Sequence, residues 1–326
     1  MDATNLAVLS LVIVIVVAAN LGERTGKWRA VVYAVLAIPG VGTLSLGLVY
    51  LLLAAVQHVL PTALPAPAMA DLGEINLGRI GVWLTVGGLL SWVVLLPPVR
   101  RGLARLIPIR PDSMANAVAL ALLAILLAHS LALGGLGPQG LVALTGQLSV
   151  LQVVLSEVPL ALAGAFGVGL FIRRTPRETW ERLGIQGLTR RQVGLSLAGV
   201  VGLLAFEVAV NAIAARISPE QFEQLSRSTE HLYARLGTPL AAVTVSLAAG
   251  TAEEILFRGA LQPRFGLLLT TIVFGVVHMQ YGLLFALLSI GGVGLVLGLY
   301  RQRINTTSSI LIHSLYNLVL FLFSGL

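Results

Sequence analysis

The sequence predicts an all-α fold, a polytopic transmembrane helical bundle of about ten spans, and two observations carry this prediction. Of the 326 residues, 57% are hydrophobic and 11% are charged, and the mean hydropathy is +0.93, well outside the range of soluble domains. Apolar runs such as 5–20 and 282–300 approach or reach the length that crosses the hydrocarbon core of a bilayer. Because lipid offers the backbone no hydrogen bonds, each span is expected to be an α-helix.

The placement of charge supports the same topology. Candidate spans are found at 5–20, 30–57, 80–97, 114–133, 148–172, 193–214, 238–260, 265–279, 281–300 and 308–325. Sixteen basic residues fall in the connections on one side of the predicted membrane, namely Arg24, Lys27, Arg29, Arg100, Arg101, Arg105, Arg110, Arg173, Arg174, Arg177, Arg182, Arg190, Arg191, Arg264, Arg301 and Arg303. The connections on the other side hold Arg79, Arg216, Arg227 and Arg235. Because cytoplasmic loops collect basic residues, the richer side is expected to be cytoplasmic and both termini outside.

Three stretches between the spans have distinct compositions. Residues 173–192 carry six arginines together with Trp180 and Leu183, which is typical of an interfacial helix on the cytoplasmic side. Residues 217–237 begin with a Ser-Pro-Glu helix start and are expected to form an amphipathic helix on the outer face. Residues 60–73 are rich in proline and alanine and are expected to form an outer loop.

Composition disfavours several other classes of site. The chain has no cysteine, so disulfides, thiolate metal sites and thiol nucleophiles are excluded. The net charge of +7 is explained by the arginine-rich cytoplasmic loops of a membrane protein. No basic surface with interleaved aromatic residues is found in the sequence, so nucleic-acid binding is not expected.

Two adjacent carboxylates and an arginine stand within an otherwise apolar span. Because ionisable groups inside a membrane are costly, Glu253, Glu254 and Arg258 are candidates for a functional site. Glu254 and Arg258 are spaced i and i+4, so they share a helical face and are expected to form an ion pair, which could be purely structural. Glu253 is rotated by about 100° from Glu254, so its side chain is expected to face a different neighbour.

Two later spans supply the other polar groups. One ends with Phe274 and His278, and the last begins with His313 and Asn317, again spaced i and i+4. A carboxylate, two imidazoles and an amide suffice for hydrolysis, in which one group activates water and others stabilise the oxyanion. The same groups could form a metal site, with histidine and glutamate as ligands and water in an open position. His313 and Asn317 could also serve only as interhelical hydrogen-bonding groups, and Phe274 is expected to be a packing residue.

Four further polar residues lie in the earlier spans. Glu157 and Glu207 are in mid-span, and each is expected to be protonated or paired across helices, since burial disfavours the charged form. His129 and Asn211 are expected to make local hydrogen bonds.

The candidate residues differ in their expected depth within the membrane. Counted from the arginine-rich end at 1.5 Å per residue, Glu253 lies about 16 Å inside, His278 about 21 Å and His313 about 9 Å. These helices must therefore be tilted or broken for the side chains to meet, and the turn at 278–282 is expected to be sunk into the bilayer. A polar cavity open toward the cytoplasm or laterally toward lipid is expected.

The order of three motifs on three late helices resembles the CAAX protease and bacteriocin-processing (CPBP, or Abi) family of intramembrane proteases. The "ILFRGAL" sequence after the paired glutamates is also similar to the bacterial members. The resemblance covers about residues 148–326, which divides the chain into N-terminal transmembrane helices of unknown role (1–145) and a CAAX-protease-like core (146–326). The motifs are Glu253-Glu254-x-x-x-Arg258, Phe274-x-x-x-His278 and His313-x-x-x-Asn317.

The resemblance implies a role for each motif residue. Glu253 would be the catalytic carboxylate and, with His278, would activate the attacking water, while His313 and Asn317 would act as oxyanion donors or on the side of a metal. The candidate metal ligands are accordingly Glu253, His278 and His313. The cofactor would be a divalent metal such as zinc, or the glutamate and histidine would act without a metal. The remainder of the first motif, Glu254 and Arg258, would form a supporting ion pair.

The resemblance also implies a function. The chain would be an intramembrane endopeptidase that hydrolyses a peptide bond of a membrane-associated protein or peptide. Relatives trim the last three residues from prenylated CaaX proteins or are linked to bacteriocin maturation and self-immunity. The expected partners are the lipid bilayer and the membrane-associated substrate, and the expected location is a prokaryotic plasma membrane, as a multi-pass protein.

Two alternatives from other classes remain open on the sequence. A proton- or ion-coupled transporter would use the intramembrane acids, and mid-span Glu157 and Glu207 would suit it. A non-catalytic membrane scaffold or immunity protein would bind a partner through its helices. The buried pair Glu253 and Glu254 argues against a scaffold, since such a protein has no need of two adjacent acids in a span.

Overall fold

A computed structural model describes residues 3–25, 28–59, 75–136, 149–219, 222–223, 226, 238–278 and 285–323. The described elements of the N-terminal half are α1 (Ala3–Thr25), α2 (Arg29–Val59), α4 (Leu77–Val93), α5 (Pro97–Leu103) and α6 (Met114–Leu133). Those of the C-terminal half are α8 (Val150–Gly167), α9 (Pro176–Leu183), α10 (Arg190–Ile217), α12 (Pro239–Glu254), the π-helix η1 (Ile255–Leu261), α13 (Gln262–Val276), the π-helix η3 (Ala286–Ile290), α15 (Gly291–Arg303) and α16 (Thr306–Phe323).

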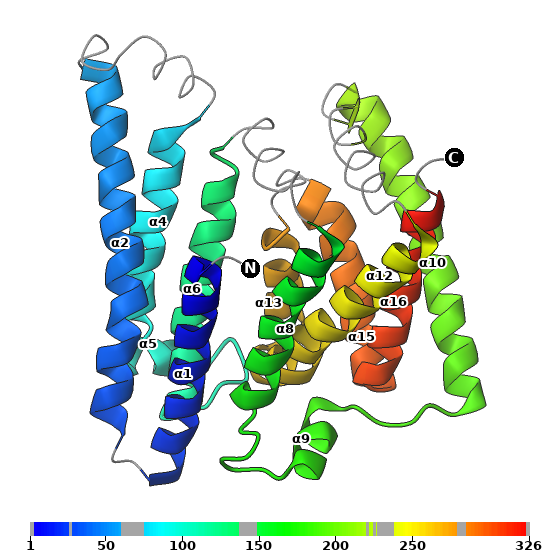
Figure 1. The fold of residues 1–326 in the computed structure, drawn as a ribbon, viewed down its shortest axis with the longest axis horizontal. Coiled ribbons are helices and arrows are strands. Elements are labelled where there is room, and N and C mark those ends of the chain that lie inside the picture. Colours follow the sequence, from blue (N-terminus) through cyan, green and yellow to red (C-terminus); the bar gives the residue numbers. More distant parts are fainter. Residues whose placement is uncertain are drawn as a thin grey trace.

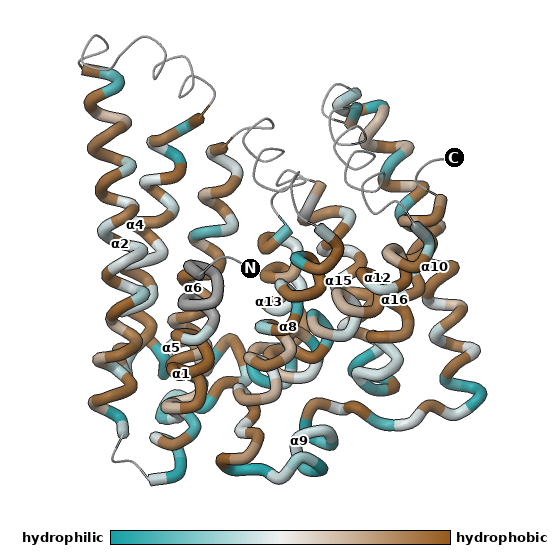
Figure 2. The backbone as a smooth tube through the Cα atoms, viewed as in Figure 1, coloured by the Kyte–Doolittle hydropathy of each residue, from teal (hydrophilic) through white to brown (hydrophobic). Residues whose placement is uncertain are grey.

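The described elements confirm an all-α, polytopic membrane bundle. Six of the described helical stretches are long and apolar enough to cross a membrane, or seven if the bent pair α4 and α5 counts as one span. Figure 2 shows hydrophobic residues along the lengths of the helices and hydrophilic residues gathered toward the lower edge, around α9. The arginine-rich connections α8–α10 and α15–α16 lie on this lower side in Figure 1, as do the end of α1 and the start of α2.

The span count differs from the predicted ten in an informative place. The candidate spans 238–260 and 265–279 fall in one apolar helical stretch, Pro239–Val276, which carries η1 in its middle. Gly266 breaks this stretch with φ 82° and ψ 169°, a backbone region open mainly to glycine. The helix is therefore kinked within α13, and the predicted need for broken helices is met here.

Three predicted features lie wholly or largely outside the described residues. They are the outer loop at 60–73, the amphipathic helix at 217–237 and the turn at 278–282 beyond His278.

The N-terminal half is held by close packing of apolar helices. Helix α4 packs between α2 and α6, and a Cβ atom added at Gly88 of α4 would lie 2.7 Å from the Leu44 backbone nitrogen of α2. Glycine therefore permits a backbone approach that a larger side chain would prevent, as is common between membrane helices. The two halves meet where α1 packs against both α6 and α8 (Figure 1).

A second contact between the halves lies beneath the candidate site. Leu120 and Leu123 of α6 share a buried cluster with Phe257 of η1 and with Phe265 and Phe274 of α13. The N-terminal half therefore packs directly against the helices that carry the first two motifs.

The stretch predicted as an interfacial helix is shorter than 173–192. Helix α9 begins after Thr175, whose hydroxyl and the Glu178 carboxylate form a reciprocal capping box, and it ends at Gly184 with φ 74°. Its two large apolar residues point in different directions, since Trp180 is 43% exposed and Leu183 is fully buried. One side of α9 therefore packs against the rest of the protein through Leu183, and Trp180 lies on its exposed side.

Candidate active site

The first motif lies where an α-helix changes into a π-helix. Glu253 and Glu254 are the last residues of α12, and Arg258 lies in η1. The wider turn of a π-helix disrupts the regular hydrogen-bond ladder and is frequent at functional sites. Two arginines from other elements donate to carbonyls of η1: Arg182 to the Gly259 oxygen at 3.3 Å and Arg301 to the Arg258 oxygen at 3.3 Å.

The third motif is brought against the first by a close approach of α12 and α16. A Cβ atom added at Gly250 would lie 2.8 Å from the Ser314 backbone nitrogen, so α16 lies directly against α12 one turn before the paired glutamates. At its start, α16 is anchored by Thr306, whose hydroxyl donates to the Leu183 oxygen at 2.5 Å. His313 consequently enters the site from a helix far from α12 in sequence.

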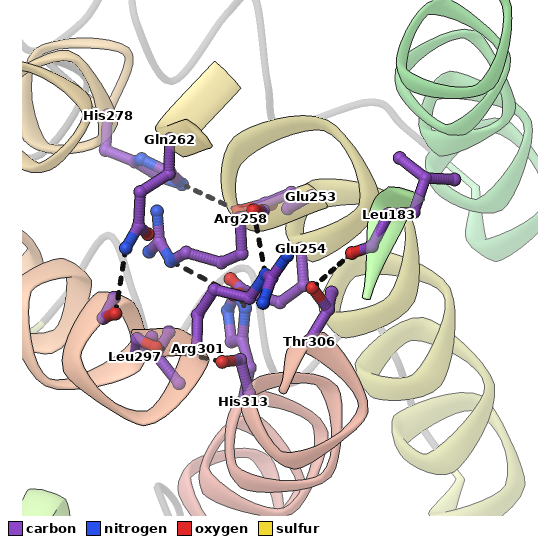
Figure 3. Close-up of polar contacts among 12 residues, drawn as sticks. Leu183, Glu253, Glu254, Arg258, Gln262, His278, Leu297, Arg301, Thr306 and His313 are labelled. Carbon is purple, nitrogen blue, oxygen red and sulfur yellow. Dashed lines mark hydrogen bonds and ion pairs between the residues drawn. The ribbon is translucent and has the colours of Figure 1, made fainter. Parts of the chain in front are cut away.

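Glu254 is the centre of a buried three-residue network (Figure 3). Its Oε2 lies 3.1 Å from Arg258 Nε, and its Oε1 lies 3.1 Å from His313 Nδ1. The side chains of Glu254 and Arg258 are 0% and 1% exposed, so neither charge is compensated by solvent. The ion pair predicted from the i, i+4 spacing is confirmed, and the pairing explains how an arginine and a glutamate are tolerated in an apolar span.

Glu253 faces a different partner, His278, as its rotation on the helix predicted. The distance from His278 Nε2 to Glu253 Oε2 is 3.9 Å, and the two side chains are 21% and 12% exposed. This distance is too long for a direct hydrogen bond, yet both atoms can contact the same water oxygen. This pair is more accessible than the network around Glu254.

The tautomer of His278 follows from its other contact. Its Nδ1 lies 2.8 Å from the Phe274 carbonyl oxygen, one turn earlier. A carbonyl only accepts, so Nδ1 carries a proton and donates it, and in the neutral ring Nε2 is left as an acceptor directed at Glu253. Figure 3 shows His278 and His313 reaching the adjacent glutamates from different helices.

Phe274 lies between the two pairs. Its ring centroid is 5.0 Å from that of His278 and 5.9 Å from that of His313, and the Arg258 guanidinium lies 4.5 Å from the ring centroid. Sequence reasoning treated Phe274 as packing alone. Its place in the second motif, four residues before His278, was the signal that it belongs to the site.

The four predicted catalytic side chains are therefore divided rather than gathered around one point. Glu253 pairs with His278, while His313 pairs with Glu254, and Asn317 is half-buried one turn further along α16. Within the described part of the chain, no hydrogen bond joins Asn317 to the other three. Sequence spacing alone did not indicate which glutamate each histidine would contact.

The predicted metal ligands do not fit an ion in this arrangement. Among the described residues, no group of three or more His, Cys, Asp or Glu side chains is placed to hold a metal ion. The Nδ1 atom of His313 faces Glu254, so Nε2 is the nitrogen of this ring that is left for a further contact.

The two unexplained mid-span acids have different surroundings. Glu207 of α10 accepts hydrogen bonds from Ser289 of η3 at 2.6 Å and from Tyr316 of α16 at 3.0 Å. It therefore connects three helices, as the expected pairing across helices requires. Glu157 of α8 lies in electrostatic range of Glu253 and His313. It lines a pocket of about 350 Å³ between α8 and α12, whose other lining residues are Val154, Val158, Ala161, Leu247, Ala248, Thr251 and Ala252.

Comparison with known proteins agrees with the motifs. A family model described as type II CAAX prenyl endopeptidase Rce1-like matches residues 235–319, which include both glutamates and both histidines of the site. No curated protein and no solved structure matches the chain. This family match supports a general function as a membrane endopeptidase. Residues 235–319 therefore form an Rce1-like CAAX endopeptidase domain, consistent with the CPBP family of intramembrane proteases, within a helical membrane protein.

Proposed function

We propose that this chain is an intramembrane endopeptidase in which Glu253 and His278 activate the water that attacks a peptide bond. The observation that carries the proposal is the orientation of His278, whose Nδ1–H donates to Phe274 and whose Nε2 faces Glu253 at 3.9 Å. A water between them can donate one proton to the carboxylate and the other to Nε2. Its lone pairs are then directed away from both groups, toward a substrate carbonyl.

The proton balance of this step is simple. As the water oxygen bonds to the scissile carbonyl carbon, Glu253 takes one water proton and later delivers it to the leaving amine, when the carbon–nitrogen bond breaks. The oxyanion of the tetrahedral intermediate requires a donor, and we assign this role to His313 as an imidazolium, in which Nδ1–H donates to Glu254 and Nε2–H is left for the oxyanion, with Asn317 beside it on α16. Arg258 neutralises Glu254, which leaves the negative charge of the site on Glu253.

This mechanism uses no metal, because the described residues do not fit one. We propose that activity withstands chelators. Elemental analysis of the purified protein tests this, and stoichiometric zinc together with loss of activity on chelation would contradict it.

The pocket between α8 and α12 supports a substrate that approaches within the membrane. Its lining is apolar apart from Glu157 and Thr251, and one lining residue, Ala252, directly precedes Glu253 in the chain. We propose that an apolar segment of a membrane-associated peptide approaches the site along this surface. We propose a prenylated CaaX-type protein terminus or a bacteriocin-like peptide as the substrate, processed in a prokaryotic plasma membrane.

The test is proteolysis by the purified full chain in liposomes. The probes are a quenched fluorescent farnesylated peptide with a CaaX terminus, the same peptide without the prenyl group, and an apolar bacteriocin-precursor peptide. Glu253→Gln and His278→Gln are each expected to lower the rate by about 10²–10⁴-fold without loss of folded protein, since the first removes the proton-transfer group and the second removes the Nε2 acceptor that orients the water.

Matched controls are available in the same chain. His129→Gln removes an exposed histidine that makes the same contact with the carbonyl four residues earlier, at 2.9 Å. Glu181→Gln removes an exposed carboxylate of α9. Both controls should cleave like the wild type. Equal cleavage by the wild type, Glu253→Gln and His278→Gln would end the proposal.

A further inference from the structure

Five arginines from four separate segments gather at one end of the C-terminal half. We call them the arginine cluster, and they are Arg173, Arg174, Arg182, Arg264 and Arg301. Arg173 and Arg174 belong to the turn after α8, while the others lie in α9, α13 and α15. Arg182 interacts electrostatically with Arg173, Arg174 and Arg301, and Arg264 interacts with Arg173, Arg174 and Arg182.

The cluster has few acidic neighbours. Among the described residues, Glu23 and Glu178 are the carboxylates in electrostatic range of it, and Arg110 adds a further positive charge. The Glu23 carboxylate is occupied by the Ser113 hydroxyl and by the Ala115 backbone N–H. Glu178 accepts from Thr175 in the capping box of α9. Two carboxylates offset only part of the charge of five guanidinium groups, so the cluster keeps a net positive charge.

The guanidinium groups are held by backbone carbonyls instead of carboxylates. Arg264 donates to the Gly167 oxygen at 2.8 Å, and Arg182 and Arg301 donate to the carbonyls of η1, while Arg174 contacts the Val168 oxygen. The Nε of Arg173 is buried and has no hydrogen-bond partner within the described part of the chain. Carbonyls orient the guanidiniums but leave their full positive charge in place.

This arrangement differs from an ordinary arginine-rich cytoplasmic loop. Arg190, Arg191 and Arg303 lie on the same side and are exposed, as the positive-inside rule alone would give. The five cluster residues are half-buried and close to one another. Burial, and after it the guanidiniums of Arg174, Arg301 and Arg173, lowers the pKa of Arg182.

Two exposed aromatic residues flank the cluster. Phe171 is 73% exposed and has φ 60°, an uncommon conformation for a residue other than glycine. The turn that holds it is closed by a hydrogen bond from the Phe171 N–H to the Arg174 oxygen at 2.9 Å. Trp180 of α9 is 43% exposed. Exposed aromatic residues beside basic ones at the end of membrane helices are typical of a protein surface at the lipid headgroups.

We propose that the arginine cluster binds the phosphate group of an anionic phospholipid headgroup. Planar guanidiniums bind phosphate oxygens in pairs, and basic pockets between membrane helices on the cytoplasmic side are suited to anionic headgroups. Arg173 Nε provides a hydrogen-bond donor for the phosphate, and the net positive charge of the cluster attracts it. Phe171 and Trp180 contact the adjoining lipid. The site is independent of the proposed peptidase chemistry.

The geometry also connects this site to the first motif. Arg182 and Arg301 of the cluster donate to the carbonyls of η1, the π-helix that carries Arg258. A headgroup drawn to these guanidiniums would reinforce their present positions and so stabilise η1.

The experiment measures lipid binding by the full chain after delipidation in detergent. Native mass spectrometry records retained lipid from equal mixtures of phosphatidylglycerol and phosphatidylcholine, and thermal unfolding records the shift in Tm produced by each lipid and by inorganic phosphate. The wild type should retain phosphatidylglycerol preferentially and be stabilised by it. Equal retention of both lipids would overturn the proposal without any variant, and an equal Tm shift from inorganic phosphate would show that the site takes a free anion rather than a lipid.

Variants locate the site. The double variant Arg173→Gln with Arg182→Gln should weaken the affinity for phosphatidylglycerol by about five-fold for each arginine, about twenty-five-fold in total. The matched double variant Arg190→Gln with Arg191→Gln removes the same charge from an exposed position and should leave the affinity within about two-fold of wild type. If both double variants lose the same affinity, general surface charge binds the lipid and the proposal fails.

Discussion

His129 and His278 make the same local contact in the two halves of the molecule, yet their surroundings differ. In α6, His129 Nδ1 lies 2.9 Å from the Ile125 oxygen, and after α13, His278 Nδ1 lies 2.8 Å from the Phe274 oxygen. His129 is exposed, whereas His278 faces Glu253 and packs against Phe274. Both histidines contact the carbonyl four residues earlier, so what makes His278 a candidate catalytic group is the nearby Glu253 carboxylate.

The same contrast extends to the two halves. Among the described residues, the helices from α1 to α6 are regular α-helices, and both π-helices, η1 and η3, lie in the C-terminal half. Each π-helix adjoins a buried carboxylate: Glu254 directly precedes η1, and Glu207 accepts from Ser289 of η3. Irregular backbone accompanies buried polar groups here, since both depend on partners supplied by neighbouring helices.

The largest expected effect concerns the buried ion pair of the C-terminal half. Arg258→Met should lower the free energy of unfolding by about 3–5 kcal/mol, because it leaves Glu254 buried without its cation. Chemical unfolding in detergent measures this change. Combining Arg258→Met with Glu254→Leu should recover much of the loss, because no unpaired charge then remains in the interior.

The N-terminal half provides the comparison for that variant. Arg100 is also buried, at 5% exposure, but it donates to backbone carbonyls, including the Pro111 oxygen at 2.6 Å. Arg100→Met should cost about 1.5–3 kcal/mol, since hydrogen bonds are lost but no carboxylate is left unpaired. A larger loss for Arg100→Met than for Arg258→Met would contradict the distinction between the halves.

A smaller effect should come from the close packing of the N-terminal half. Gly88→Ala places a methyl group 2.7 Å from the Leu44 backbone nitrogen and should lower the unfolding free energy by about 1–3 kcal/mol while leaving peptidase activity intact. Gly42→Ala in α2, where an added Cβ meets nothing within 4 Å, should instead stabilise by about 1 kcal/mol. Equal effects from the two substitutions would show that the close approach of α2 and α4 is unimportant.

Ser289→Ala tests the polar contacts of η3 at a lower magnitude. Removing its hydrogen bond to Glu207 should cost about 0.6–1.7 kcal/mol, the range for interhelical hydrogen bonds within membranes. Ser156→Ala is the control, because that hydroxyl donates only to the Val153 oxygen of its own helix and is exposed. An unchanged Tm for Ser289→Ala would mean that the Glu207 network does not hold η3 in place.

The smallest expected effect is a pH dependence outside the membrane. Backbone and side-chain hydrogen bonds from Thr175 lower the pKa of Glu178 below its usual value of about 4.3. Its contribution to stability is therefore present above that pH and is lost as the pH falls through the lowered pKa. Thermal unfolding should show Glu178→Gln less stable than wild type at pH 7 and equal to it in strong acid. A stability difference between Glu178→Gln and wild type that stays constant from pH 7 into strong acid would contradict the assignment.

Several features of the site could be predicted from spacing alone. The i, i+4 relation paired Glu254 with Arg258, and the 100° rotation directed Glu253 elsewhere, because both relations are properties of one helix. Helical spacing does not predict that His278 contacts Glu253 and that His313 contacts Glu254. These contacts depend on the break at Gly266 and on the approach of α16 to Gly250.

The sequence by itself determined that this protein lies in a membrane and which motifs form its site, because hydropathy and residue spacing are local properties of the chain. The tertiary structure decided which buried groups meet. It separated the residues of the predicted four-residue pocket, with His278 facing Glu253 and His313 facing Glu254, and it brought five arginines from four separate segments together at one end. Such contacts join residues as far apart as α8 and α15, and they depend on how the helices pack, bend and break, which no local spacing specifies.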